Sequence, residues 1–110
     1  MSVGEHERSI VGDLAEFTRA LCGTRAVVTE SSSFEAHIPT LNVIPRRRGA
    51  KGISIIGEQQ IVLTVGRGLR WELDYTDNDV AEARKIIRAV VEGRGTGILR
   101  WPRLHRLQAY

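Results

Sequence analysis

Residues 60–93 read QIVLTVGRGLRWELDYTDNDVAEARKIIRAVVEG, and this stretch decides the fold. Its middle part alternates, because Leu69, Trp71 and Leu73 are apolar and the residues between them are charged. A period of two is typical of a pleated strand with one buried face. The apolar spacing then becomes helical, at Val80, Ala83, Ile87 and Val90. The stretch therefore predicts two strands joined by a tight turn at residues 66–68, followed by a helix.

This helix is predicted to run from residue 77 to residue 92, with Thr76 as its N-cap and Gly93 after its last turn. A second helix is predicted near the N-terminus, over about residues 4–22. Ser2 and Glu5 resemble a capping box at its start, and Gly23 is placed to end it. Its apolar stripe consists of Ile10, Leu14, Phe17 and Leu21.

Short apolar segments between the two helices predict antiparallel strands, at residues 25–30, 34–38, 41–44, 53–56, 61–65 and 69–75. The serines at 31–33 predict a polar turn, and Pro39 and Pro45 indicate strand ends or an edge, because proline cannot donate a ladder hydrogen bond. Residues 97–101 are a further candidate strand. The predicted fold class is α+β: an N-terminal helix, an antiparallel meander of five or six strands and a C-terminal helix, with both helices packed on one face of the sheet.

Residues 1–110 are expected to form one domain, in which residues 94–110 are a basic C-terminal tail or an edge strand. Trp71 is expected to be buried against a helix, and Cys22 to be a small buried apolar group. The predicted core consists of Leu14, Phe17, Leu21, Val27, Ile38, Ile55, Leu63, Leu73, Val80, Ala83, Ile87 and Val90.

The composition is that of a soluble globular protein, with 42% apolar and 26% charged residues among 110. No apolar run reaches the roughly 20 residues that cross a bilayer, and the charged N-terminal segment lacks the apolar centre of a secretory signal. The lone cysteine excludes an internal disulfide framework and any multi-cysteine metal site. We therefore expect a cytoplasmic protein without a membrane partner.

Arginine supplies 14 of the 16 basic residues, and the formal net charge is +3. This preference for arginine over lysine predicts a GC-rich, bacterial genome. The alternative is selection for the flat, bidentate guanidinium at a phosphate or carboxylate surface.

Two basic clusters are the candidate binding residues. The first is the loop 46–51, where no acid occurs between Glu35 and Glu58. Such clusters can neutralise phosphates, although a solvated loop has the same composition. The cluster residues are Arg46, Arg47, Arg48 and Lys51 in the loop, and Arg100, Arg103 and Arg106 in the tail.

Catalytic chemistry has little support in the sequence. The glycines at 66–68 and 93–97 join strands or follow a helix, which excludes the phosphate-loop patterns. His37 shares a predicted strand face with Glu35, and this pair is a candidate for acid–base work or a small-ligand pocket. Glu72 and Asp74 are expected to make cross-strand ion pairs. The sequence predicts no catalytic residue, metal site or cofactor.

The element order resembles that of small bacterial adaptor, secretion-chaperone and toxin-immunity domains, a resemblance of architecture alone. We expect a non-enzymatic bacterial binding or adaptor module that acts through protein–protein contacts. The alternative is a nucleic-acid-binding protein that uses loop 46–51 and the basic tail, and a further alternative is a ligand pocket or minor enzyme with His37. An unpaired sheet edge also predicts a homodimer.

Overall fold

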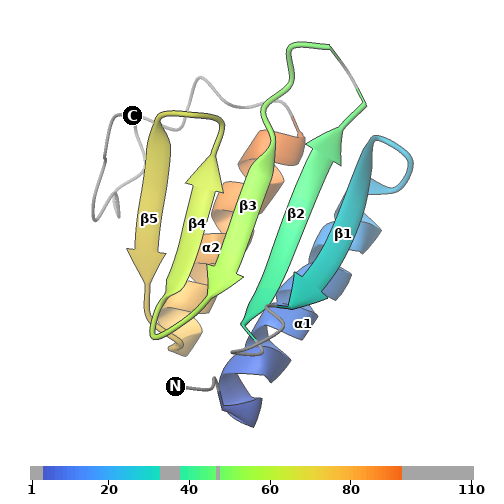
Figure 1. Cartoon of the computed structure of the whole chain (residues 1–110). Coiled ribbons are helices and arrows are strands. Elements are labelled where there is room, and N and C mark those ends of the chain that lie inside the picture. The colour runs from blue at the N-terminus through green and yellow to red at the C-terminus, as the bar shows by residue number, and fades with distance from the viewer. Residues whose placement is uncertain (1–3, 33–37, 47, 93–110) are drawn as a thin grey trace.

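Five consecutive strands form one antiparallel sheet, and one helix precedes and one follows them (Figure 1). The computed structural model describes residues 4–32, 38–46 and 48–92. The strands lie in the order β1-β2-β3-β4-β5, so every strand pairs with its neighbour in the sequence. The elements are α1 (Glu5–Cys22), β1 (Ala26–Ser32), β2 (Pro39–Pro45), β3 (Ile53–Gly57), β4 (Ile61–Val65), β5 (Leu69–Leu73) and α2 (Asp77–Val91).

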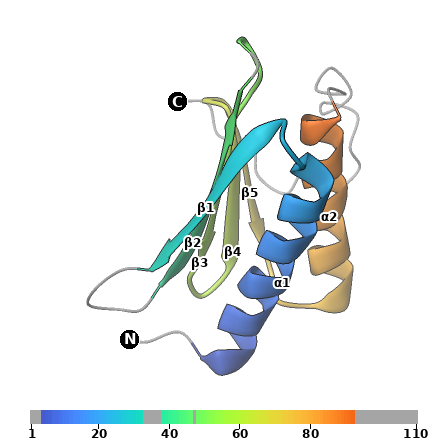
Figure 2. The same ribbon diagram turned by 90° about the vertical axis from the view of Figure 1, so that its right-hand side faces the viewer.

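Both helices lie against the same face of the sheet, so the molecule has two layers (Figure 2). The predicted α+β fold, with its meander and its two helices on one face, is thus confirmed. In β3 and β4 every second residue is buried, as the period of two requires. Ile55, Leu63 and Trp71 lie opposite one another on adjacent strands, and all three are fully buried. The expected burial of Trp71 and of Cys22 is confirmed.

The predicted core is correct for Leu14, Ile55, Leu63, Leu73, Ala83 and Ile87, which are fully buried. Four of the other predicted residues are half-buried and pack against this core: Phe17, Leu21, Val80 and Val90. Ile38 is half-buried and lies outside the strands. Buried apolar residues absent from the prediction include Val11, Leu41, Val43, Ile53, Ile61, Val65 and Ile86.

The prediction for Val27 placed it on the wrong face of its strand. It lies opposite Ile44 in the β1–β2 pair, and both side chains are exposed, at 38% and 55%. Directly opposite residues of an antiparallel pair share a face, so Val27 belongs to the face away from the helices. Its neighbours Ala26 and Val28 pack against the core instead.

Three further expectations of local structure are corrected or lie outside the described residues. Ser31 and Ser32 belong to β1 rather than to a turn, because they pair with Thr40 and Pro39. Helix α1 has Gly4 as its N-cap, without a side-chain cap hydrogen bond, which replaces the predicted capping box. Ser2 and the segments 33–37 and 93–110, with the candidate strand at 97–101, lie outside the described residues.

Gly57 sets how closely α1 approaches the sheet. It is the last residue of β3 and is buried. A Cβ atom at this position would lie 2.7 Å from Cγ2 of Val11, closer than any real methyl contact. It would also lie 3.1 Å from the phenolic oxygen of Tyr75. The absent side chain therefore allows α1 to cross the end of β3 at close range.

Candidate functional site

The described residues form two surfaces with features of a binding site. The first is the face of the sheet away from the helices, which none of the described elements covers and which faces the viewer in Figure 1. We call it the outer sheet face. Its side chains alternate with those of the core: Val27, Thr29, Ser31, Thr40, Asn42, Ile44, Ser54, Ile56, Val62, Thr64, Arg70 and Glu72.

The outer sheet face has few charges. Only Arg70 and Glu72 are charged in this set, whereas 26% of the whole chain is charged. These two lie on the same strand with 4.0 Å between Nη2 and Oε2, so their charges offset each other. This ion pair of Glu72 lies within one strand, whereas cross-strand ion pairs were predicted for Glu72 and Asp74. The carboxylate of Asp74 lies beyond β5 and accepts a hydrogen bond from Gln60.

The strand register arranges the outer sheet face in rows. One row runs across all five strands through short polar side chains and ends in a charge: Thr29, Asn42, Ser54, Thr64 and Arg70. The next row has the two β-branched residues Ile56 and Val62 at its centre, which lie opposite each other on β3 and β4. Short and β-branched side chains lose little conformational entropy when a partner covers them. Covering this face would therefore cost little side-chain entropy.

A shallow hollow lies on the outer sheet face beside the exposed Ile44. Its volume is about 340 Å³, and Asn42, Ser54, Thr64 and Arg67 contribute to its lining. Gly52 and Gly66 also line it, and the amide of Gly66 donates to the carbonyl oxygen of Gly52. Because these two glycines have no side chains, the backbone forms part of the hollow's floor. An exposed apolar side chain therefore stands next to a depression.

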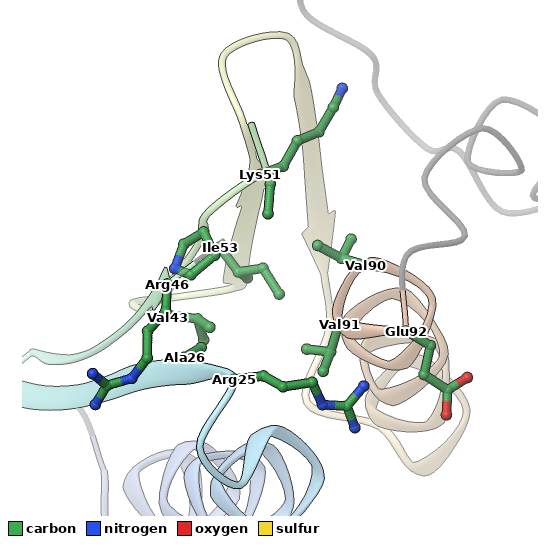
Figure 3. A pocket seen from close by; sticks show the side chains of 11 residues that line it. Arg25, Ala26, Val43, Arg46, Lys51, Ile53, Val90, Val91 and Glu92 are labelled. Atoms are coloured by element: carbon green, nitrogen blue, oxygen red, sulfur yellow. The ribbon is translucent and has the colours of Figure 1, made fainter. Parts of the chain in front are cut away.

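The second surface is a cavity between the two layers, at the end of the sheet where β1 begins and β2 ends. We call it the end pocket. Its volume is about 390 Å³. Ala26, Val43 and Ile53 line it from the inner face of the sheet, and Val90 and Val91 line it from the last turn of α2 (Figure 3). The walls are therefore apolar.

Charged residues surround the end pocket. Arg25 extends from the start of β1 toward α2, where Glu92 follows the last turn (Figure 3). Nη2 of Arg25 donates a hydrogen bond to the carbonyl oxygen of Leu21 over 3.2 Å. Arg46 and Lys51 lie on the side of the β2–β3 loop, and the Lys51 ammonium points away from the other lining residues. The pocket therefore has three cations and one carboxylate around apolar walls.

The sequence predicted some of the charged residues that surround the end pocket. Arg46 and Lys51 line the end pocket, and Arg48 is exposed in the same loop. Arg47 and the tail residues Arg100, Arg103 and Arg106 lie outside the described residues, as does His37. Arg25 was missed because it is a single charge at a strand start, with no charged neighbour in the sequence to mark it.

The end of the β1–β2 ladder at Ser32 and Pro39 lies far from the end pocket. Ser32 pairs with Pro39 at one end of the β1–β2 ladder, and Ala26 pairs with Pro45 at the other. A strand rises about 3.4 Å per residue, so the seven-residue length of β1 separates these ends by about 20 Å. The described residues that line the end pocket include no histidine.

The described part of the chain shows no arrangement for nucleophilic or metal chemistry. Burial raises the pKa of the Cys22 thiol, and the positive charge of Arg25 only partly opposes this effect. Cys22 is 1% exposed, and burial together with a raised pKa disfavours a reactive thiolate. The described residues contain no group of three or more histidine, cysteine or acidic side chains placed to coordinate a metal ion.

Within 4–32, 38–46 and 48–92, neither helix is both long and apolar enough to cross a membrane. Comparison with known proteins gives no matching family model, no matching curated protein and no matching solved structure.

Proposed function

We propose that this protein is a non-enzymatic binding module that acts through protein–protein contacts on its outer sheet face. The observation that carries the proposal is the exposed pair Val27 and Ile44 on an uncovered, charge-poor face. Protein interfaces are depleted of charged residues at their centre, and contiguous exposed apolar side chains mark interaction sites. The hollow beside Ile44 supplies the concave element that such a contact requires.

The partner that fits this face is a protein segment that places an apolar side chain in the hollow. Its neighbouring groups would hydrogen-bond to the polar row through Asn42, Ser54 and Thr64. Arg67 lines the hollow and is exposed, so an acidic residue of the partner is favoured near it. Ile44 would then be the centre of the contact, because central apolar side chains that exclude water contribute most to affinity.

The experiment compares three baits in extracts of the native host: the wild-type protein, Ile44→Glu and Ala20→Glu. Ala20 is exposed on α1, in the helical layer, and its variant adds the same charge away from the outer sheet face. A genuine partner is retained by the wild type and by Ala20→Glu and is lost from Ile44→Glu. The purified partner should then lose about 2 kcal/mol or more of binding free energy to Ile44→Glu in calorimetry. A partner that binds all three baits equally would place the contact elsewhere.

A homodimer through a sheet edge is part of the same proposal. β1 and β5 are the edge strands of the sheet, and each pairs with only one neighbour among the described elements. Unpaired strand edges are sites of association in natural proteins. Light scattering at two protein concentrations measures the oligomeric state directly. A monomer at both concentrations would remove the dimer from the proposal.

Nucleic-acid binding is the second candidate function. Within the described residues, the side chains of Arg46, Arg48 and Lys51 are in no ion pair, whereas Arg19 pairs with Glu30 and Arg70 with Glu72. Their charge is therefore available to an anionic partner.

A further inference from the structure

We propose that the end pocket binds a small organic anion, a carboxylate attached to an apolar chain. The pocket is separate from the outer sheet face, because its walls are the inner sides of β1, β2 and β3 and the last turn of α2. Its volume of about 390 Å³ lies within the range of pockets that hold small molecules, about 300–1,000 Å³.

The apolar chain of the ligand would lie between the sheet and α2. Val90 and Val91 point from α2 toward the side on which Ile53 and Ala26 lie (Figure 3). Both valines are only half-buried, in contrast to Ile86 and Ile87 one turn earlier, which are fully buried. The two layers thus remain apart at this end of the core, and an apolar ligand would remove the valines from water.

The charges of the lining determine which sign of charge the ligand carries. On the α2 side Arg25 extends toward Glu92, so their opposite charges partly offset each other (Figure 3). Arg46 and Lys51 add two positive charges at the β2–β3 loop, and both charged ends point away from the other lining residues (Figure 3). With three cations and one carboxylate the lining has a net positive charge, which favours a carboxylate over a cation. The apolar chain of the ligand would extend between Val43 and Val90.

The other occupant to consider is the chain's own C-terminal segment, which follows the lining residue Glu92 in the sequence. Residues 93–110 contain four arginines and no acidic residue. Like charges disfavour their approach to Arg25, Arg46 and Lys51. Charge complementarity therefore favours an anion over this segment.

Calorimetric titration of the full-length protein with decanoate, below its micelle concentration, tests the proposal. Decyltrimethylammonium is the control ligand, because it has the same chain and the opposite charge. We expect saturable binding of one decanoate per protein and no saturable binding of the cation. Absence of decanoate binding to the full-length chain would overturn the proposal, including the case in which the C-terminal segment occupies the pocket.

Matched variants test the position of the site. The double variant Arg46→Gln/Lys51→Gln should weaken decanoate binding by about tenfold or more, because it removes two of the three cations of the lining and with them its net positive charge. The double variant Arg8→Gln/Lys85→Gln removes the same charge at exposed positions outside the pocket lining and should bind as the wild type does. Ala50→Phe, which places a ring at the pocket wall, should also reduce binding while circular dichroism remains unchanged. Equal affinity in both double variants would overturn the assigned site.

Discussion

Tyr75 links the end of β5 to the turn between β3 and β4. Its hydroxyl donates to the carbonyl oxygen of Glu58 over 2.8 Å. Burial raises the pKa of the phenol to about 12, and the nearby carboxylates of Glu7 and Glu58 act in the same direction. The folded protein therefore holds this group in its neutral form at pH values where a free tyrosine is ionised.

The raised pKa predicts a stability effect at high pH. The folded pKa of about 12 exceeds the ordinary value of about 10, so the contribution of the neutral phenol is fully present below about pH 10. It is lost as the pH rises through the folded pKa. Tyr75→Phe should cost about 1 kcal/mol at neutral pH, because the hydrogen bond to Glu58 is removed, and this difference should shrink between about pH 10 and 12. Urea unfolding of both proteins across this range measures it, and a constant difference would contradict the assignment.

Gly57 gives a second prediction for a single residue. Gly57→Ala should destabilise the protein by about 1–3 kcal/mol, because the new methyl group would overlap Cγ2 of Val11. Val11→Ala removes the overlapping atom, so the double variant should be more stable than the sum of the two single effects indicates. Gly68→Ala is the control, since no atom lies within 4 Å of its added Cβ. If the two single changes in the free energy of unfolding simply add in the double variant, this contact does not limit how closely α1 approaches β3.

At the scale of the element, α2 begins at a cap that the sequence identified. The hydroxyl of Thr76 accepts a hydrogen bond from the amide of Asp79 over 3.2 Å, as predicted. The carboxylate of Asp79 in turn accepts from the amide of Asp74 over 2.8 Å. Asp79 is 4% exposed, so this second bond fixes the connection between β5 and α2 in a buried position. The sequence predicted only the first of these two hydrogen bonds.

Loss of the cap should weaken α2 by a defined amount. Thr76→Ala should reduce the free energy of unfolding by about 1 kcal/mol, whereas Thr76→Ser keeps the hydroxyl and should remain close to the wild type. Chemical denaturation monitored by circular dichroism provides the measurement. Equal stability of the alanine and serine variants would mean that the hydroxyl does not stabilise the helix.

At the scale of the whole molecule, the nucleic-acid alternative depends on the charge of loop 46–51. If the protein binds nucleic acid, each neutralised phosphate releases counterions, so affinity must fall steeply with salt. Changing Arg46, Arg47 and Arg48 to glutamine should then flatten the salt dependence in proportion to the phosphates that these side chains neutralise. Arg46 and Arg48 are exposed, and stability should stay within about 0.5 kcal/mol of the wild type. Mobility-shift titrations at two salt concentrations provide the test.

A control variant with the same net charge distinguishes phosphate binding by loop 46–51 from a general effect of the lower positive charge. The triple variant Arg8→Gln, Arg67→Gln and Lys85→Gln removes three positive charges at exposed positions outside the loop. It should keep the salt dependence of the wild type if the loop binds the phosphates. Absence of any shift at low salt would remove the nucleic-acid alternative and leave the protein-binding proposal.

The sequence by itself determined the elements whose signals are local. The alternation at residues 69–73, the turn at Gly66 and the cap at Thr76 depend on neighbouring residues only, and each is found where it was predicted. The antiparallel meander, predicted with five or six strands and found with five, followed from the short connections, because consecutive strands joined by short turns pair with each other.

The tertiary structure alone decided which face some residues occupy. Ala26, Val27 and Val28 are all apolar, so alternation cannot show which of them faces the core. The register with β2 settles it, because Val27 lies opposite the exposed Ile44. In the same way, pairing with Thr40 extends β1 through Ser31, where the local composition favours a turn.

The two candidate surfaces were also outside the reach of the sequence. The end pocket combines Arg25, Val43, Lys51 and Val91, which come from four separate parts of the chain. The hollow beside Ile44 exists because the β2–β3 and β4–β5 connections bring Gly52 and Gly66 together. Periodicity is a property of adjacent residues, and it shows which side of each element is apolar. A cavity or a hollow depends on where separate elements stop touching, and that is set by the packing of the whole molecule.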